Sequence, residues 1–168
     1  MNNIIDIVNQ SKHPIDSDEY IEYCNDEIKK NSILILNDFL KNDCLNELIT
    51  EAHGLQDQAF YCSQNHTILL NKQDKLSDLN DPLNREVVSD KGCVPHDLLN
   101  QKSKLNILYQ SNIFKNFLKG VLNLKDIYPY SDTLSSINYN YYQKSQQLGW
   151  HFDNASFAIT LMIQSSDK

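Results

Sequence analysis

The spacing of apolar residues changes along this chain, from mostly helical up to Val121 to strand-like in the last third. Ser17 can cap a first helix, and two later stretches repeat the helical spacing. The apolar positions are Tyr20, Cys24 and Ile28, then Leu45, Leu48, Ile49 and Ala52 before Gly54, then residues 105–121, with an end at Gly120 or Asn123. Helices followed by strands in series are typical of an α+β protein.

Several segments predict strands or loops. Residues 55–99 lose any clear periodicity and contain Pro82, Gly92 and Pro95, so we expect long loops there. Short strands are expected within that stretch at 59–62 and 67–70, and further strands at 33–36, 134–142, 150–153 and 157–164. No repeat or low-complexity tract marks a boundary, which predicts a single domain over residues 1–168.

Composition excludes several classes of partner. The chain has 22 acidic and 15 basic residues, a net charge of −7 and no basic cluster. Nucleic acid and anionic membrane surfaces are therefore not expected as partners. The N-terminus lacks the features of a signal peptide and no stretch is long enough for a membrane helix, which favours a cytoplasmic protein. The four cysteines are far apart, which favours reduced, structural thiols over a zinc or redox pair.

The predicted strand at 134–142 has two different faces. Side chains of a strand alternate, so Ile137, Tyr139 and Tyr141 fall on one side. The other side carries Asn138, Asn140 and Tyr142. This second set forms either a solvated face or the polar lining of a binding site.

His151 and Asp153 are two residues apart on the next predicted strand. That spacing lets both side chains point the same way. An imidazole and a carboxylate with open positions beside them suit Fe(II) in a site of two histidines and one carboxylate. The alternative is that the pair merely decorates a turn, because His-x-Asp is a short and common pattern.

The neighbourhood of this pair resembles the iron(II)/2-oxoglutarate-dependent oxygenases. Asn140-x-Tyr142 followed by His151-x-Asp153 is similar to the arrangement in that superfamily. The segment 147–164 (QLGWHFDNASFAITLMIQ) resembles a branch of hydroxylases and halogenases that act on free amino acids. Further likeness to this branch lies in 92–95 (GCVP), 105–109 (LNILY) and 128–132 (YPYSD).

The resemblance implies a role for each matching residue. His151 and Asp153 would be two of the three iron ligands, and Asn138, Asn140 and Tyr142 would contact 2-oxoglutarate. The resemblance also implies helices packed on an incomplete double-stranded β-helix (a jelly roll), with a small-molecule substrate such as a free amino acid. In the halogenases a small residue replaces the carboxylate, so Asp153 favours hydroxylation.

His96, in the loop around Pro95, could lie near the substrate. The alternative is an ordinary surface-loop histidine. Of the two interpretations, the surface-loop histidine is the favoured one.

The chain departs from the family pattern in two ways. The family has a second histidine and a basic residue well after His-x-Asp, whereas the other histidines here and the sole arginine, Arg85, precede it. We therefore expect an N-terminal portion of an oxygenase, truncated after the motif, that binds Fe(II) weakly and turns over no 2-oxoglutarate alone. The alternative is a non-catalytic remnant or interaction module of the same fold. An incomplete barrel also predicts self-association through an exposed strand edge at 157–163.

Overall fold

The computed structural model describes residues 4–132 and 134–165. They form two compact units, each assembled from two separate stretches of chain. Unit 1 comprises the described residues up to His53 together with those from Pro95 to Ile137, and unit 2 comprises Gly54–Val94 and the described residues from Asn138 onward. The helices pack in unit 1 and a three-stranded sheet lies in unit 2, which confirms the α+β expectation. The single domain expected over residues 1–168 stays a prediction.

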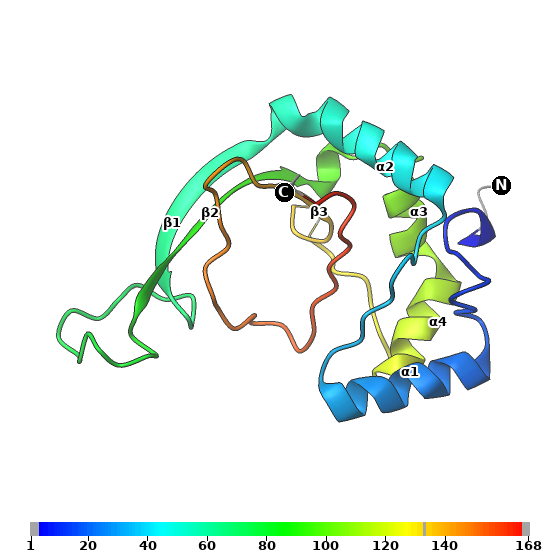
Figure 1. Cartoon of the computed structure of the whole chain (residues 1–168), viewed down its shortest axis with the longest axis horizontal. Helices are drawn as coiled ribbons and strands as arrows, with labels where there is room; N and C mark the ends of the chain where they lie inside the picture. Colours follow the sequence, from blue (N-terminus) through cyan, green and yellow to red (C-terminus); the bar gives the residue numbers. More distant parts are fainter. Residues whose placement is uncertain (1–3, 133, 166–168) are drawn as a thin grey trace. The chain divides into compact units, whose positions relative to one another are not determined.

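Figure 1 labels the α-helices and the strands in their order along the chain. The elements are the short 3-10 helix η1 (Ile4–Asp6), α1 (Asp18–Asn31), α2 (Asn42–Leu55), η2 (Gln56–Gln58), β1 (Phe60–Thr67), β2 (Glu86–Pro95), η3 (His96–Leu98), α3 (Lys104–Gln110), α4 (Asn112–Val121) and β3 (Asn138–Tyr141). Within residues 4–132 and 134–165, no helix combines the length and apolar composition that crossing a bilayer requires.

Helix α1 begins and ends where its sequence signals predict. The Ser17 hydroxyl accepts a hydrogen bond from the Tyr20 N–H at 3.4 Å, which satisfies one of the free donors of the first turn. At the other end Ser32 adopts φ 58°, and its N–H donates to the Ile28 carbonyl at 2.8 Å. The predicted apolar face is confirmed at its centre, because Cys24 is buried.

The core of unit 1 is built where α1 packs against α4. Phe117 of α4 is 2% exposed, and its ring stacks on Tyr20 of α1 with centroids 6.1 Å apart. Gly120 permits a close approach, since a Cβ there would lie 2.4 Å from Ile21 Cγ2. The Asn25 side chain donates to the Val121 carbonyl at 2.7 Å, so α1 also satisfies the C-terminal end of α4.

The helical spacing over 105–121 belongs to two helices instead of one. Ser111 separates them in an extended conformation, with φ −64° and ψ 127°. Its N–H donates to the Leu108 carbonyl, and its hydroxyl accepts from the Phe114 N–H. A serine competes for backbone hydrogen bonds, which explains how it can interrupt an otherwise continuous apolar pattern.

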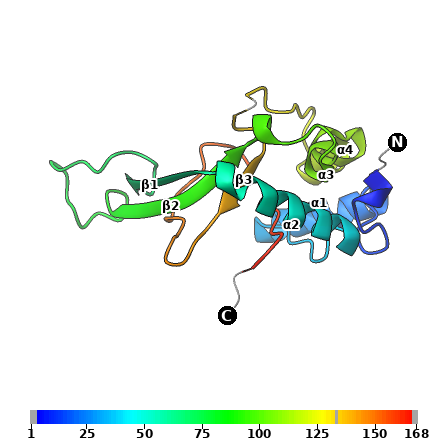
Figure 2. The same ribbon diagram turned by 90° about the horizontal axis from the view of Figure 1, so that it is seen from above.

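Unit 2 contains a long hairpin where the sequence predicts mostly loops. Both views of the chain show β1 and β2 running side by side (Figures 1 and 2). They are antiparallel in a register that pairs Phe60 with Cys93 and Thr67 with Glu86. The expected short strand at 59–62 is confirmed over 60–62 by β1, whereas the expectation of a strand at 67–70 is wrong beyond Thr67. Both faces of these two strands carry partly exposed polar residues, so the alternation of apolar and polar residues that would predict a strand is weak here.

The third strand, β3, pairs with β2 and confirms the centre of the predicted strand at 134–142. Three other predicted strands are wrong: residues 33–36, 150–153 and 157–164 have no strand structure. Ile33 and Ile35 are exposed, as are Phe157 and Ile159. An apolar run becomes a strand only when a neighbouring strand pairs with it, and composition alone does not supply that neighbour.

Candidate metal site

The segment that carries His151 and Asp153 is held against β2 by hydrogen bonds. The Asp90 N–H donates to the Gln147 carbonyl at 2.7 Å, and the Gln146 side chain donates to Asp90 Oδ1 at 2.9 Å. Two residues later the Gly149 N–H donates to Ser89 Oγ at 3.1 Å. These bonds fix the direction in which the chain enters the candidate site.

Gly149 lies so close to β2 that no other residue fits. A Cβ at this position would lie 2.7 Å from the Val88 carbonyl oxygen and 3.0 Å from Val87 Cγ2. Real Cβ atoms do not approach a carbonyl oxygen that closely, so any side chain here would push the segment away from the strand. The glycine is therefore a requirement of close packing next to His151.

The tautomer of His151 follows from its own hydrogen bond. Nδ1 lies 2.7 Å from the Gly149 carbonyl oxygen. A carbonyl oxygen only accepts hydrogen bonds, so Nδ1 carries the proton and Nε2 of the neutral ring carries the lone pair. Metal-binding histidines are commonly oriented in this way, with one ring nitrogen donating to a carbonyl and the other facing the metal.

Nε2 of His151 faces the carboxylate of Asp153. The distance from Nε2 to Asp153 Oδ1 is 3.3 Å, and the two side chains are 19% and 54% exposed. Two electron-rich atoms at this distance need a proton or a cation between them. Ligands at right angles on one metal ion, each with a bond of about 2.1 Å, lie about 3 Å apart. The structure thus brings together the two metal ligands that the sequence predicts.

A second histidine lies beside this pair, and the sequence gives no sign of it. His66, on β1, is 8% exposed, and its ring meets that of His151 edge to face with centroids 5.9 Å apart. Its Nδ1–H donates to the Thr67 carbonyl at 2.8 Å, and the Ser89 hydroxyl donates to its Nε2 at 2.6 Å. Both ring nitrogens are thus engaged within the protein. Across the described ranges, no three histidine, cysteine or acidic side chains are arranged to hold a metal ion.

The predicted 2-oxoglutarate contacts lie on and after β3. Asn138 and Asn140 are exposed, whereas Tyr139 between them is buried, so the predicted alternation of faces is confirmed. Tyr142 is 48% exposed, and its partial burial raises the pKa of its hydroxyl, with Cys93 nearby adding to the shift. Tyr142 is therefore a neutral hydrogen-bond donor at neutral pH. No hydrogen bond in the part of the chain that the structure describes joins these three residues to His151 or Asp153.

His96, in unit 1, has partners for both ring nitrogens. Its Nε2–H donates to Asn106 Oδ1 at 3.2 Å, and the Ser136 hydroxyl donates to its Nδ1 at 2.6 Å. The ring also meets Tyr109 edge to face, with centroids 6.0 Å apart. His96 thus connects three parts of unit 1, and these contacts account for it without a ligand.

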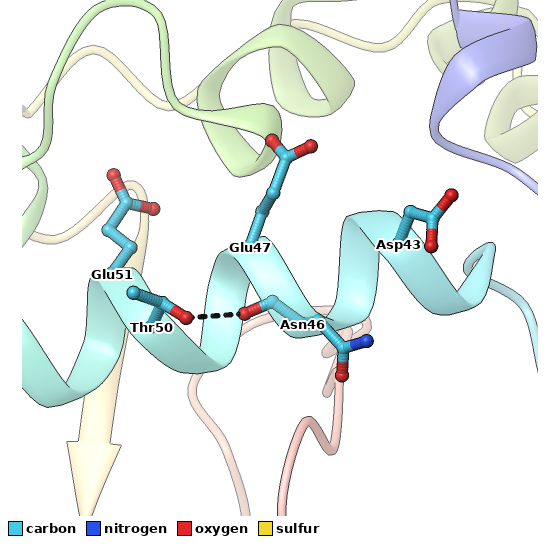
Figure 3. A pocket seen from close by; sticks show the side chains of 5 residues that line it. All are labelled: Asp43, Asn46, Glu47, Thr50 and Glu51. Carbon is cyan, nitrogen blue, oxygen red and sulfur yellow. Dashed lines mark hydrogen bonds between the residues drawn. The ribbon is translucent and has the colours of Figure 1, made fainter.

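An acidic row on α2 lines a shallow hollow in unit 1. Figure 3 shows Asp43, Glu47 and Glu51 leaving the same side of the helix. Lys104 Nζ lies 3.8 Å from Glu47 Oε2, and the Ser103 hydroxyl donates to Glu51 Oε2 at 2.6 Å. Two of the three carboxylates thus bind the start of α3, and the row is part of the packing of unit 1.

The cysteines do not add to the site. All four are free; Cys24 and Cys44 are buried, and Cys62 and Cys93 are half-buried. Burial raises the pKa of the Cys44 thiol to about 11, so it stays protonated at neutral pH. This agrees with the expectation of reduced, structural thiols.

Comparison with known proteins gives no independent assignment of this site. No protein-family model, no curated protein and no solved structure matches the chain.

Proposed function

We propose that His151 and Asp153 bind Fe(II) in a 2-oxoglutarate-dependent oxygenase of the hydroxylase type, of which this chain forms the N-terminal portion. Its complete fold would be a double-stranded β-helix, and its substrate a small molecule such as a free amino acid. One observation supports the proposal most: His151 Nε2 lies 3.3 Å from Asp153 Oδ1, while Nδ1 of the same ring bonds the Gly149 carbonyl. The resemblance of the surrounding sequence supplies the identity of the metal and of the co-substrate.

The donor set fits part of an iron site. An imidazole nitrogen and a carboxylate oxygen are suitable ligands for Fe(II), and the hydrogen bond from Nδ1 to the Gly149 carbonyl orients the imidazole. Bound Fe(II) and 2-oxoglutarate would supply the O₂-activating chemistry that hydroxylates an aliphatic carbon. The side chains would bind the metal, orient the co-substrate and exclude water.

The remaining residues divide this work. Asp153 would contribute negative charge to the metal, and its presence favours hydroxylation over halogenation. Asn138, Asn140 and Tyr142 would offer amide groups and a phenol to the polar ends of 2-oxoglutarate. The proposal requires a third ligand and a cation for the far carboxylate of 2-oxoglutarate, and we infer no residue for either. Two ligands hold Fe(II) weakly, so we expect binding that a chelator reverses readily.

Anaerobic titration with Fe(II) tests the proposal. We expect saturable binding at one site, weakened by about tenfold or more in His151→Gln and in Asp153→Asn, since removing a ligand should cost at least as much as removing a residue that orients one. His13→Gln is the control, because His13 is a histidine of unit 1, 7% exposed, with no proposed role in metal binding. Absence of saturable binding, or equal binding by all four proteins, would contradict the proposal.

A second measurement tests whether the residues of this chain complete the site. The proposed N-terminal portion and the non-catalytic remnant both allow metal binding, whereas only a complete site releases succinate from 2-oxoglutarate. We expect no succinate from the chain alone. Succinate release by the purified chain would show that the residues present complete the site.

A further inference from the structure

Three hydrogen bonds connect the buried His66 through Ser89 and Gly149 to His151, and a fourth, to Thr67, orients the His66 ring. The Thr67 carbonyl accepts from His66 Nδ1–H, which leaves the lone pair of the neutral ring on Nε2. The Ser89 hydroxyl donates to that lone pair, so its oxygen is left to accept from the Gly149 N–H. The Gly149 carbonyl accepts from His151 Nδ1–H. Each bond thereby fixes the direction of the next.

The start of this chain of bonds is rigid. His66 is 8% exposed and Thr67 is 3% exposed, so water does not compete for their hydrogen bonds. The other end of this series of hydrogen bonds is rigid because Gly149 lies against the Val88 carbonyl with no room for a Cβ. Among the residues that the structure describes, Ser89 alone has hydrogen bonds to both His66 and Gly149.

We propose that His66 and Ser89 are positioning residues that hold Gly149 in place, so that its carbonyl keeps His151 in the tautomer whose Nε2 faces Asp153. The role in metal binding rests on the proposed function, whereas the tautomer does not. The register of the hairpin explains the arrangement. Gln64 pairs with Ser89, which places Ser89 near His66 across the two strands. Neither residue needs to touch a metal for this role.

Two readouts test the proposal on the whole chain. The imidazole ¹⁵N shifts report the tautomer of His151 in the metal-free protein, at a pH where the ring is neutral. We expect a single Nδ1–H tautomer in the wild type, a mixture of tautomers in Ser89→Ala, and the wild-type result in Ser89→Thr, which restores a hydroxyl. A Ser89→Ala protein with an unchanged His151 tautomer would overturn the proposal.

Metal affinity provides the second readout, with Co(II) as a visible probe. We expect Ser89→Ala and His66→Gln each to weaken Co(II) binding by about 10- to 100-fold, the usual effect of removing a residue that orients a ligand. Ser89→Thr and His13→Gln should bind as the wild type does. Since His66 is buried, His66→Gln can fail to fold, and Ser89→Ala then decides the matter alone.

The same variants exclude a different role for His66. If His66 were itself a metal ligand, Ser89→Ala would free its Nε2 and leave Co(II) affinity equal or higher, while His66→Gln would abolish binding. That result would overturn the positioning role. A wild-type protein that binds no Co(II) or Fe(II) would contradict the proposed function instead, and the ¹⁵N measurement would still test the positioning.

Discussion

Two buried histidines, one in each unit, have nearly the same hydrogen bonds and different surroundings. His13 is 7% exposed; its Nε2–H donates to the Asn37 carbonyl at 2.8 Å, and the Tyr20 hydroxyl donates to its Nδ1 at 2.6 Å. His66 likewise bonds one carbonyl and one hydroxyl. The comparison therefore separates what a buried histidine does for folding from what it does for a neighbouring site.

The two histidines differ in the other contacts of the residue whose hydroxyl binds them, Tyr20 for His13 and Ser89 for His66. Tyr20 belongs to an aromatic group in the core of unit 1, where His13 also meets Phe39 with centroids 5.7 Å apart. Burial raises the pKa of the Tyr20 hydroxyl, which keeps it a donor. Ser89, in contrast, passes the contact on to Gly149 and hence to His151. The hydroxyl that binds the buried histidine thus belongs to the aromatic core in unit 1, whereas in unit 2 it binds the segment that carries His151 and Asp153.

The largest expected effect concerns the core around His13. Phe117→Ala removes a ring that is 2% exposed, and we expect the free energy of unfolding to fall by about 3–5 kcal/mol. Phe60→Ala in β1 is the matched control, because that ring is 72% exposed and should cost about 0.5 kcal/mol or less. Urea unfolding followed by circular dichroism measures both. Similar losses in the two variants would mean that the core of unit 1 lies elsewhere.

A smaller effect is expected from His13 itself. His13→Leu leaves the Tyr20 hydroxyl and the Asn37 carbonyl without their partner, at a cost of about 1–3 kcal/mol in the free energy of unfolding. Fe(II) affinity should not change. Loss of Fe(II) binding in this variant, measured on folded protein, would remove the distinction between the two histidines.

The third prediction addresses the close packing of Gly149. Gly149→Ala forces the segment away from the Val88 carbonyl, and we expect a loss of about 1–3 kcal/mol in stability together with weaker Fe(II) binding. Gly54→Ala is the control, since a Cβ there meets nothing within 4 Å and alanine favours a helix. That variant should be as stable as the wild type or more so. Equal Fe(II) affinity in both variants would contradict the role of Gly149.

The smallest effect is a pH dependence in unit 1. Burial raises the pKa of Cys44 to about 11 from its ordinary value of 9.0, so the folded state holds this proton more tightly than the unfolded state. The resulting stabilisation is fully present below pH 9 and is lost as the pH rises through 11. We expect Cys44→Ala to flatten the stability curve in that range. A wild-type curve that is already flat from pH 9 to 11 would contradict the shift.

The sequence predicted those features that depend on neighbours in the chain. Helix α1 follows from Ser17 and one apolar face, and the two faces of β3 follow from alternation. The convergence of His151 and Asp153 follows from their short separation, although the predicted strand is absent and the pair lies in an irregular segment.

The features that were missed depend on distant pairing. The register of β1 with β2 brings Ser89 beside His66, and no local pattern in either strand specifies it. The apolar run at 33–36 predicts a strand by its composition, yet no strand pairs with it and Ile33 and Ile35 are exposed. For the same reason His66 could not be connected to His151 before the hairpin was known.

The imidazole ¹⁵N spectrum, recorded before and after adding Fe(II) under anaerobic conditions, tests the central claim most directly. Before addition we expect His151 to be protonated on Nδ1 and His13 on Nε2. After addition the Nε2 signal of His151 should broaden or disappear first, while the signals of His13 stay unchanged. A His151 protonated on Nε2 at the outset, or Fe(II) broadening that affects both histidines equally, would contradict the assignment of His151 and Asp153 as a metal site.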